Sequence, residues 1–226
     1  LRVSEPNGVA RGPAVVTTGV PFARGTVRDA ARLSASVAGR PVPAQFVAIV
    51  PWDDGSVRWA LMDVQVNVPA NGQVELVVSD AGGNPAPPAA VTVKEAADAV
   101  RVSTGPLEFT VSRKKFNLFE SLRVDGREVV TSAGRGLVVH KDGGGAVSAG
   151  APAEVTIEQA GPMRATVCVR GRFPGLHNGL LGYTVRISAF AGQKSVKVHA
   201  WLENHGAMGY HRRRSSGPTT SPNMEW

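Results

Sequence analysis

The stretch PWDDGSVRWALMDVQV, residues 51–66, contains the pattern that decides the fold. Asp54-Gly55 is a strong signal for a tight hairpin turn, because both residue types tolerate positive φ. The residues after this turn follow the period of two of a β-strand, which places Val57, Trp59 and Leu61 together on one face. The stretch therefore predicts a turn that leads into a strand with one buried face, and it places Trp59 in the core.

The same period of two recurs along the chain, in runs separated by glycine and proline, whereas helical periodicity is nearly absent. Further alternating runs occupy residues 107–111, 165–169, 183–187 and 196–200. Other expected strands are 13–18, 33–38, 44–50, 73–78, 91–93, 98–103, 121–125, 136–140 and 153–158. The only helical candidate is 27–33. The pattern predicts an all-β protein, a sandwich or barrel of antiparallel strands with little helix.

The segment DAGGNPAPPAA, residues 80–90, is the one strong compositional break. We therefore expect a first β subdomain in 1–80, a linker rich in glycine and proline in 81–90, and a second β subdomain in 91–202. A single barrel remains the alternative. Residues 141–152 are expected to form a flexible loop, and 203–226 an irregular tail that is either truncated or an interface segment.

Composition limits the functional classes. The chain has 226 residues, 42% of them hydrophobic, and a net charge of +7, which favours anionic partners such as uronate polysaccharide, nucleic acid or an acidic protein surface. Few aromatic residues are expected at the surface and no basic helix is predicted, which argues against nucleic acid. No run is long enough for a membrane helix. The chain begins without methionine, so we expect a segment of a longer protein.

Several motifs together resemble a known family. They are VPFARGTVRD (20–29), VPAQFVAIVPWDDGSVRWALMDVQV (42–66), GPLEFTVSRKKFNLFESLRVDG (105–126) and AGPMRATVCVRGRF (160–173). Their order resembles the amino-terminal RIFT-type β-barrel domain of exo-rhamnogalacturonan-lyase-like (RglX/YetA-like) proteins, over most of residues 15–202. In that family this domain precedes a helical toroid thought to carry the catalytic residues, which the chain does not contain. The resemblance therefore implies a β module and assigns no catalytic residue here.

Two groups of residues are candidates for ligand binding. Trp52 and Arg58 flank the turn, although aromatic residues beside turns more often bury area than bind sugar, so we favour a structural interpretation. Strand alternation also projects a row of basic side chains from the face opposite the core, which could bind carboxylates or remain solvated. The candidates in this row are Arg170, Arg172, Arg186 and Lys197, accompanied by Arg164 and His199.

Catalytic candidates are weaker. β-Elimination of a uronate needs a base and a cation, which Tyr210, His211, His205 and Arg212 could supply, but their spacing matches no motif. The histidine spacing does not suit a metal site, and no cofactor is expected. Cys168 lies between arginines that could lower its pKa, but a lone cysteine is weak evidence for a nucleophile.

We therefore expect a non-catalytic β module with a structural or docking role, in contact with other domains of its own chain or with copies of itself. Contact with acidic polysaccharide is part of this hypothesis, as is an extracellular or surface location. Two alternatives stay open: a structural component of a virion, such as a phage tail or capsid, or of a surface assembly, and a polysaccharide lyase acting by β-elimination.

Overall fold

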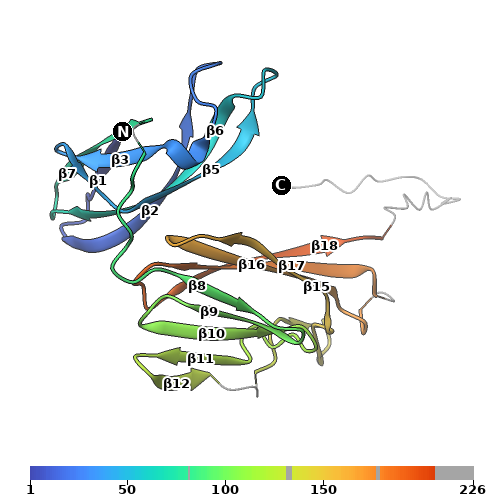
Figure 1. Ribbon diagram of the computed structural model, residues 1–226. Helices are drawn as coiled ribbons and strands as arrows, with labels where there is room; N and C mark the ends of the chain where they lie inside the picture. Colours follow the sequence, from blue (N-terminus) through green and yellow to red (C-terminus); the bar gives the residue numbers. More distant parts are fainter. Residues whose placement is uncertain (81, 131–133, 177–178, 207–226) are drawn as a thin grey trace, which may run out of the picture.

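The computed structural model describes residues 1–80, 82–130, 134–176 and 179–206 (Figure 1). Across these ranges the fold is all-β, as the alternating runs predicted, and the single helical element is a 3-10 turn, Ala30–Arg32. This turn lies inside the run 27–33, where Asp29 accepts a hydrogen bond from the Ala31 backbone N–H and caps it. No helix in the described ranges has the length and apolar character needed to cross a membrane.

The N-terminal unit consists of two sheets around one hydrophobic core. Its strands are β1 (Arg2–Ser4), β2 (Arg11–Pro21), β3 (Ser34–Val37), β4 (Arg40–Pro41), β5 (Ala44–Pro51), β6 (Val57–Val68) and β7 (Gln73–Ser79). They form sheets of order β2-β6-β5 and β1-β7-β3-β4. Ala60, Met62 and Val64 of β6 are fully buried, and Leu33 and Leu76 pack into the same cluster. The longest strand therefore supplies the centre of this core.

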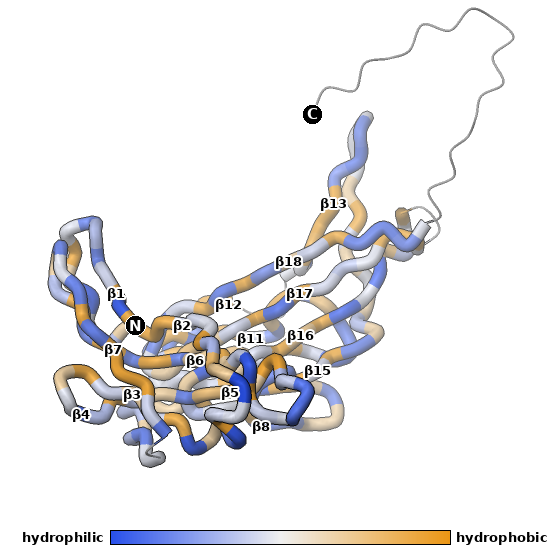
Figure 2. The backbone as a smooth tube through the Cα atoms, turned by 90° about the horizontal axis from the view of Figure 1, so that it is seen from above, coloured by the Kyte–Doolittle hydropathy of each residue, from blue (hydrophilic) through white to orange (hydrophobic). Residues whose placement is uncertain are grey.

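The C-terminal unit is a sandwich. Its strands are β8 (Thr92–Glu95), β9 (Ala99–Ser103), β10 (Leu107–Ser112), β11 (Ser121–Val124), β12 (Arg127–Val130), β13 (Val138–His140), β14 (Ala146–Ser148), β15 (Pro152–Ala160), β16 (Arg164–Arg172), β17 (Leu181–Phe190) and β18 (Val196–Asn204). A sheet of order β12-β11-β10-β9-β8 faces a sheet of order β15-β16-β17-β18. The hairpin of β13 and β14 projects beyond one end (Figure 2). Apolar side chains of both sheets fill the space between them.

Two of the expected buried faces differ from the structure. Trp59 was expected in the core, but it is 38% exposed, whereas Ala60 and Met62 are buried. The reason is an irregular register between β5 and β6, where Val50 pairs with Trp59 but Pro51 pairs with Val57. This mismatch shifts the alternation of β6 by one residue. Val57 therefore faces the core, whereas Trp59 and Leu61, two and four residues further on, do not. The alternating pattern therefore predicted the strand correctly but assigned the wrong residues to its buried face.

The run 196–200 was also expected to have a buried face. Instead Val198 is 38% exposed and Ala200 is exposed, because β18 is the last strand of its sheet. The residues 141–152, expected to be a flexible loop, include strand β14, which pairs with β13 around a turn of three glycines. Short pairing of this kind leaves little alternation to detect in the sequence.

The two units are joined by a buried ion pair. Asp63 of β6 is fully buried, and its Oδ2 lies 3.1 Å from Nε of Arg164 at the start of β16. Its other oxygen accepts a hydrogen bond from Thr17 Oγ at 2.5 Å. Burial raises the pKa of Asp63, and the Thr17 hydrogen bond and the Arg164 charge oppose that rise. Burial therefore disfavours the charged carboxylate, and these two partners offset part of that cost.

Polar side chains reinforce the same junction. Gln45 Oε1 of β5 accepts a hydrogen bond from the Met163 backbone N–H at 3.0 Å. A side chain at Gly161 would overlap the Gln45 amide, so glycine leaves room for Gln45 in its observed position. At the other end of the junction, Gln193 Nε2 donates to the Pro13 carbonyl at 3.0 Å. These contacts fix the N-terminal unit over one face of the sandwich (Figure 1).

Replacing Asp63 by alanine is expected to destabilise the protein by about 3 kcal/mol, because it leaves the Arg164 guanidinium almost buried without a counter-charge. Urea unfolding measures this change in the free energy of unfolding. The matched control is Glu154→Ala, which breaks an exposed ion pair with Arg170 and is expected to cost about 0–1 kcal/mol. Equal losses in the two variants would contradict a stabilising role for the buried pair.

Candidate binding site between the two units

The outer face of the β15–β18 sheet lies toward the N-terminal unit (Figure 1). The register places Cys168, Arg186 and His199 in one row across β16, β17 and β18. Alternation along each strand directs these side chains away from the sandwich core, where Val167 and Val169 are buried. Neighbouring strands therefore bring polar residues from distant parts of the sequence onto one surface.

The centre of this surface is Arg186. Its Nε and terminal nitrogen contact both oxygens of Glu158 in β15, at 2.7 and 2.8 Å. Its guanidinium carbon also lies 5.2 Å from the ring centroid of Trp201 in β18, within the range of a cation–π contact. The Arg186 hydrogen bond is the chief reason that the pKa of Glu158 lies below its usual value. Arg186 is thus held between a carboxylate and an aromatic ring.

Two further side chains of β18 continue the surface. The His199 ring lies edge-on to Trp201, with 5.6 Å between ring centroids, and Trp201 is 42% exposed. Lys197 is exposed and has no ion-pair partner among the described residues. We call Glu158, Arg186, Lys197, His199 and Trp201 the outer-face cluster. Together they offer an aromatic ring beside three groups that can donate hydrogen bonds to an anion.

A cavity of about 310 Å³ adjoins the outer-face cluster. Thr17 and Leu61 of the N-terminal unit contribute one wall, and residues of all four strands of the sheet contribute the other. The sandwich residues of the lining are Glu158, Gln159, Arg164, Thr166, Arg186, Ser188, Phe190, Lys197 and His199. The side-chain nitrogen of Gln159 is buried without a hydrogen-bond partner in the described part of the chain. Most residues that line the cavity are thus polar or charged, and both units contribute to it.

Cys168 lies beneath the outer-face cluster and is fully buried. Burial raises the pKa of its thiol, and the nearby Glu158 carboxylate raises it further, against the smaller opposing effect of Arg186 and Arg170. The arginines do lower this pKa, as the sequence suggested they could, but burial and the Glu158 carboxylate outweigh them. The thiol is therefore in the state that is least suited to act as a nucleophile.

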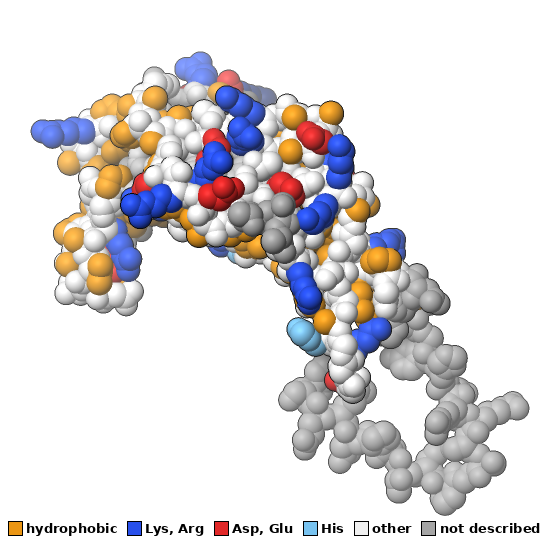
Figure 3. All heavy atoms as spheres, turned by 90° about the horizontal axis from the view of Figure 1, so that it is seen from below, with side chains coloured by type: hydrophobic (Ala, Val, Ile, Leu, Met, Phe, Trp, Pro, Cys, Tyr) orange, Lys and Arg blue, Asp and Glu red, His pale blue; other side chains and the backbone are white. Residues whose placement is uncertain are grey.

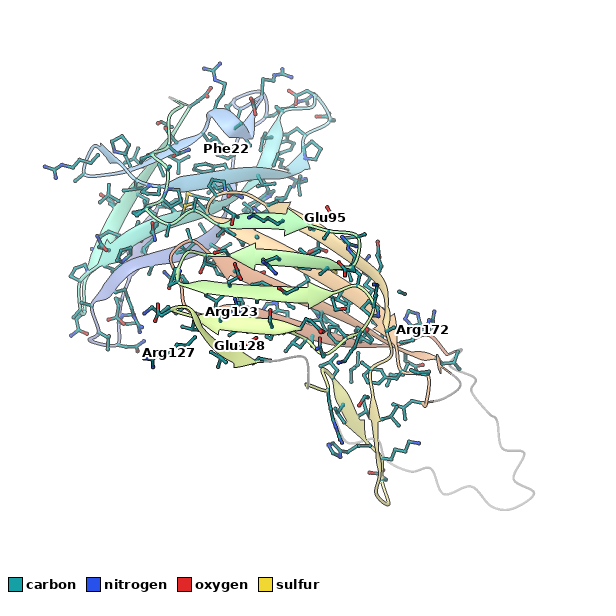
Figure 4. All side chains as sticks on the ribbon, turned by 60° about the horizontal axis from the view of Figure 1, so that its bottom comes forward. Phe22, Glu95, Arg123, Arg127, Glu128 and Arg172 are labelled. Carbon is teal, nitrogen blue, oxygen red and sulfur yellow. The ribbon has the colours of Figure 1, made fainter. Side chains whose placement is uncertain are left out.

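Most of the basic row predicted from the sequence is paired within the protein. Arg170 contacts Glu154 at 3.0 Å, and Arg186 contacts Glu158. Arg172 lies at the far end of β16 from the N-terminal unit (Figure 4) and donates to the Gly179 carbonyl at 3.0 Å. Among the predicted ligand residues on this face, Arg186 and Lys197 are therefore the two that line the cavity.

Trp52 and Arg58, the other predicted ligand residues, lie together on the N-terminal unit. The Arg58 guanidinium carbon is 4.7 Å from the centroid of the Trp52 ring, and Trp52 Nε1 donates to the carbonyl of Phe22 at 3.1 Å. The adjoining turn is held by Asp54, which accepts hydrogen bonds from the backbone N–H and side chain of Ser56. Asp54 therefore has a structural role, as the turn signal indicated.

The opposite face of the sandwich has a different character. On the surface formed by β8–β12, basic and acidic side chains are interspersed (Figure 3). Arg113 forms an ion pair with Glu95, and Arg123 lies 3.9 Å from Glu128. This face supplies matched positions for controls, because its charges lie on the same sandwich but away from the cavity.

The catalytic candidates lie mostly outside the described residues. Tyr210, His211 and Arg212 belong to 207–226, so their positions are not part of the structure. His205 is described, and its Nε2 lies 3.3 Å from a carboxylate oxygen of Glu203. In the described ranges no three His, Cys, Asp or Glu side chains are grouped to hold a metal ion.

Sequence reasoning did not select Trp201, Glu158 or Asp63. Trp201 is two residues from His199 and four from Lys197 in the same strand. Strand alternation alone therefore predicts that all three lie on the same face. Glu158 and Asp63 gave no such signal, because their partners Arg186 and Arg164 lie in other strands, and the pairing of those strands was not predicted.

Comparison with known proteins matches both units. Residues 6–79 match the PcRGLX-like N-terminal RIFT barrel domain, and residues 91–206 match the PcRGLX-like protein central beta sandwich domain. The chain is also 23% identical over 207 residues to the uncharacterized protein YetA of Bacillus subtilis (strain 168), covering 83% of this chain and 23% of that protein. The family and an N-terminal RIFT-type barrel are confirmed, but the barrel does not extend over most of residues 15–202 as expected, because the motifs at 105–126 and 160–173 lie in the central sandwich domain. The chain belongs to the PcRGLX-like family and comprises its N-terminal barrel and central sandwich modules.

Proposed function

We propose that this chain is a non-catalytic binding module for acidic polysaccharide, and that the outer-face cluster and the adjoining cavity hold the sugar. The observation that carries the proposal is the half-exposed ring of Trp201 beside Arg186 and His199, with Lys197 farther along the same face of β18. Aromatic faces bind the apolar faces of sugar rings, and guanidinium and ammonium groups bind carboxylates. A uronate presents both features in one residue.

The geometry of the cavity supports a small, extended ligand. Its volume of about 310 Å³ is at the lower end of the range typical of small-molecule sites. Lys197 and His199 of the edge strand β18 line the cavity, which suits a polymer that enters from the side of β18. Because the two units share its walls, the cavity depends on the Asp63–Arg164 junction.

The charge balance favours an anionic ligand of modest affinity. Glu158 neutralises much of the Arg186 charge, so Lys197 supplies the unpaired positive charge at the cavity. Exposed charges of this kind are screened by salt, so affinity for an acidic polymer is expected to fall as ionic strength rises. The proposed setting is extracellular or surface-associated, where acidic polysaccharides are encountered, with the modules acting as part of a longer chain or assembly.

Replacing Trp201 by alanine is expected to weaken binding of polygalacturonate oligomers about tenfold, and Lys197→Ala about fivefold, because the first removes the stacking surface and the second the unpaired cation. Isothermal titration calorimetry at low salt measures both affinities.

The matched control is Lys94→Ala, because Lys94 is an exposed lysine on β8 of the other sheet. It is expected to leave the affinity unchanged. The proposal is wrong if the three variants bind polygalacturonate equally well, or if a neutral polymer such as galactan binds as tightly as polygalacturonate.

The Glu158–Arg186 pair predicts a pH-dependent stability. The pKa of Glu158 lies below the ordinary value of 4.5, so folding favours its ionised form. The contribution of the ionised Glu158 carboxylate to the free energy of unfolding is complete above pH 4.5. It is lost as the pH falls through the pKa of Glu158 in the folded state. Wild type is therefore expected to melt at a higher temperature than Glu158→Gln at neutral pH, and the difference is expected to shrink in acid. Thermal unfolding followed by circular dichroism measures it.

The control for this experiment is the same comparison in an Arg186→Met background. Without the guanidinium, the chief cause of the lowered pKa is absent, so the Glu158→Gln difference is expected to lose its dependence on pH. A difference that stays constant with pH in the wild-type background would show that the pair does not stabilise the ionised carboxylate.

A further inference from the structure

Strand β18 ends its sheet with an open edge. In the described part of the chain it pairs only with β17, over the full run from Val196 to Asn204. Figure 2 shows it along the margin of the sandwich. Proteins usually protect such edges with proline, bulges or short strands, but β18 has nine residues, contains no proline and pairs with β17 in unbroken register. The edge is thus open to another strand.

The backbone groups at this edge can be assigned. The His205 N–H donates to the Leu180 carbonyl, so the odd-numbered residues of β18 direct their backbone groups toward β17. The even-numbered residues therefore direct theirs outward, and the backbone groups of Val198, Ala200 and Leu202 have no strand partner within residues 1–206 as described. Two of these side chains are also exposed apolar groups, because Val198 is 38% and Leu202 is 59% exposed.

The sequence of β18 is complementary to itself when it is read in reverse. In an antiparallel pair of two copies centred on Ala200, Lys197 lies opposite Glu203 and Val198 lies opposite Leu202. His199 then lies opposite Trp201. Opposite charges and apolar or aromatic residues that face each other across strands stabilise a sheet, and a two-fold axis forms each of these pairs twice.

Other symmetric registers lack the pairing of Lys197 with Glu203: centring the pair on Trp201 sets His199 against Glu203 but leaves Lys197 against His205. Centring the pair on Val198 sets Lys197 against His199, and centring it on Leu202 sets Trp201 against Glu203. The Ala200 centre also places two residues with outward backbone groups directly opposite each other, which is the hydrogen-bonded pair of an antiparallel ladder. The Ala200 centre is therefore the register that pairs Lys197 with Glu203 and Val198 with Leu202.

We propose that β18 is a homodimer interface, in which two copies of this chain pair edge to edge around Ala200 and join their four-stranded sheets into one. The apolar side chains of Val198 and Leu202 cover one another on the core side. On the outer face, the rows of Lys197, His199 and Trp201 from the two copies become neighbours. The interface is argued from the strand alone and does not depend on polysaccharide binding.

The first test is the mass of the 226-residue chain in solution, measured by sedimentation equilibrium over about a hundredfold range of concentration. We expect twice the chain mass of 23.6 kDa at the upper end. Ala200→Pro is expected to abolish the dimer, because proline lacks the N–H at the centre of the ladder. The substitution breaks no bond to β17, since the Ala200 backbone groups point outward. Ala200→Ser, which keeps the N–H, is the matched control and is expected to remain dimeric.

The second test addresses the register and does not rely on proline. Lys197→Glu places two glutamates opposite each other at both symmetric positions, so the dimer dissociation constant is expected to rise about tenfold. Glu203→Lys is expected to have a similar effect through opposed lysines. The double variant, Lys197→Glu with Glu203→Lys, restores opposite charges and is expected to recover dimerisation.

Three outcomes would overturn the inference. A monomer throughout the concentration range excludes the dimer, and a dimer that survives Ala200→Pro uses another surface. A double variant no stronger than the two single variants rules out this register. Because Ala200→Pro changes no residue of the outer-face cluster, polygalacturonate binding by that variant is measured independently, and failure of either proposal is distinguishable from failure of the other.

Discussion

The buried ion pair of Asp63 and Arg164 is the constraint on which the rest of the arrangement depends. It joins a central strand of the barrel to the first residue of a central strand of the sandwich, and it is satisfied only when both units are in place. Separating the units would expose the two charges to water or leave each one buried without its partner. A buried ion pair therefore fixes the relative position of the two units more than it adds to the free energy of unfolding. The junction decides which part of the sandwich sheet is covered and where the cavity opens.

The motifs that resemble the family meet one another in space. Gln45 from the second motif binds the backbone beside Gly161 of the fourth, and Asp63 and Arg164 link the same two motifs. Within the barrel, Arg24 of PFARG lies 3.2 Å from Asp53 of WDDGS. Within the sandwich, the Asp125 N–H of VDG donates to the Pro106 carbonyl of GPL. The matched residues are therefore largely those that hold the modules together, and the outer-face cluster lies beside them.

The sheet formed by β15–β18 offers two surfaces to partners, its outer face and its free edge, and each is exposed for a different physical reason. Its outer face is polar because alternation excludes those residues from the core, and Arg170 and Arg186 are neutralised by carboxylates of β15. Its free edge arises because the sheet ends at β18, which leaves backbone groups and apolar side chains exposed. The ladder of a second strand would use backbone groups that a ligand does not need, but Lys197, His199 and Trp201 belong to both proposed contacts, so a ligand and a second copy would share these side chains.

The sequence by itself determined the all-β class, most of the strands, the turn at Asp54-Gly55 and the family, because period-two alternation and turn residues act over a few neighbours. It also placed Arg186 and Lys197 on one face. It could not determine which face of the strand containing Trp59 is buried, because a register shift against β5 changes which residues face the core. Only the tertiary structure decided that Glu158 neutralises Arg186, that Cys168 is buried, and that Asp63 meets Arg164, because each depends on pairing between segments far apart in the chain.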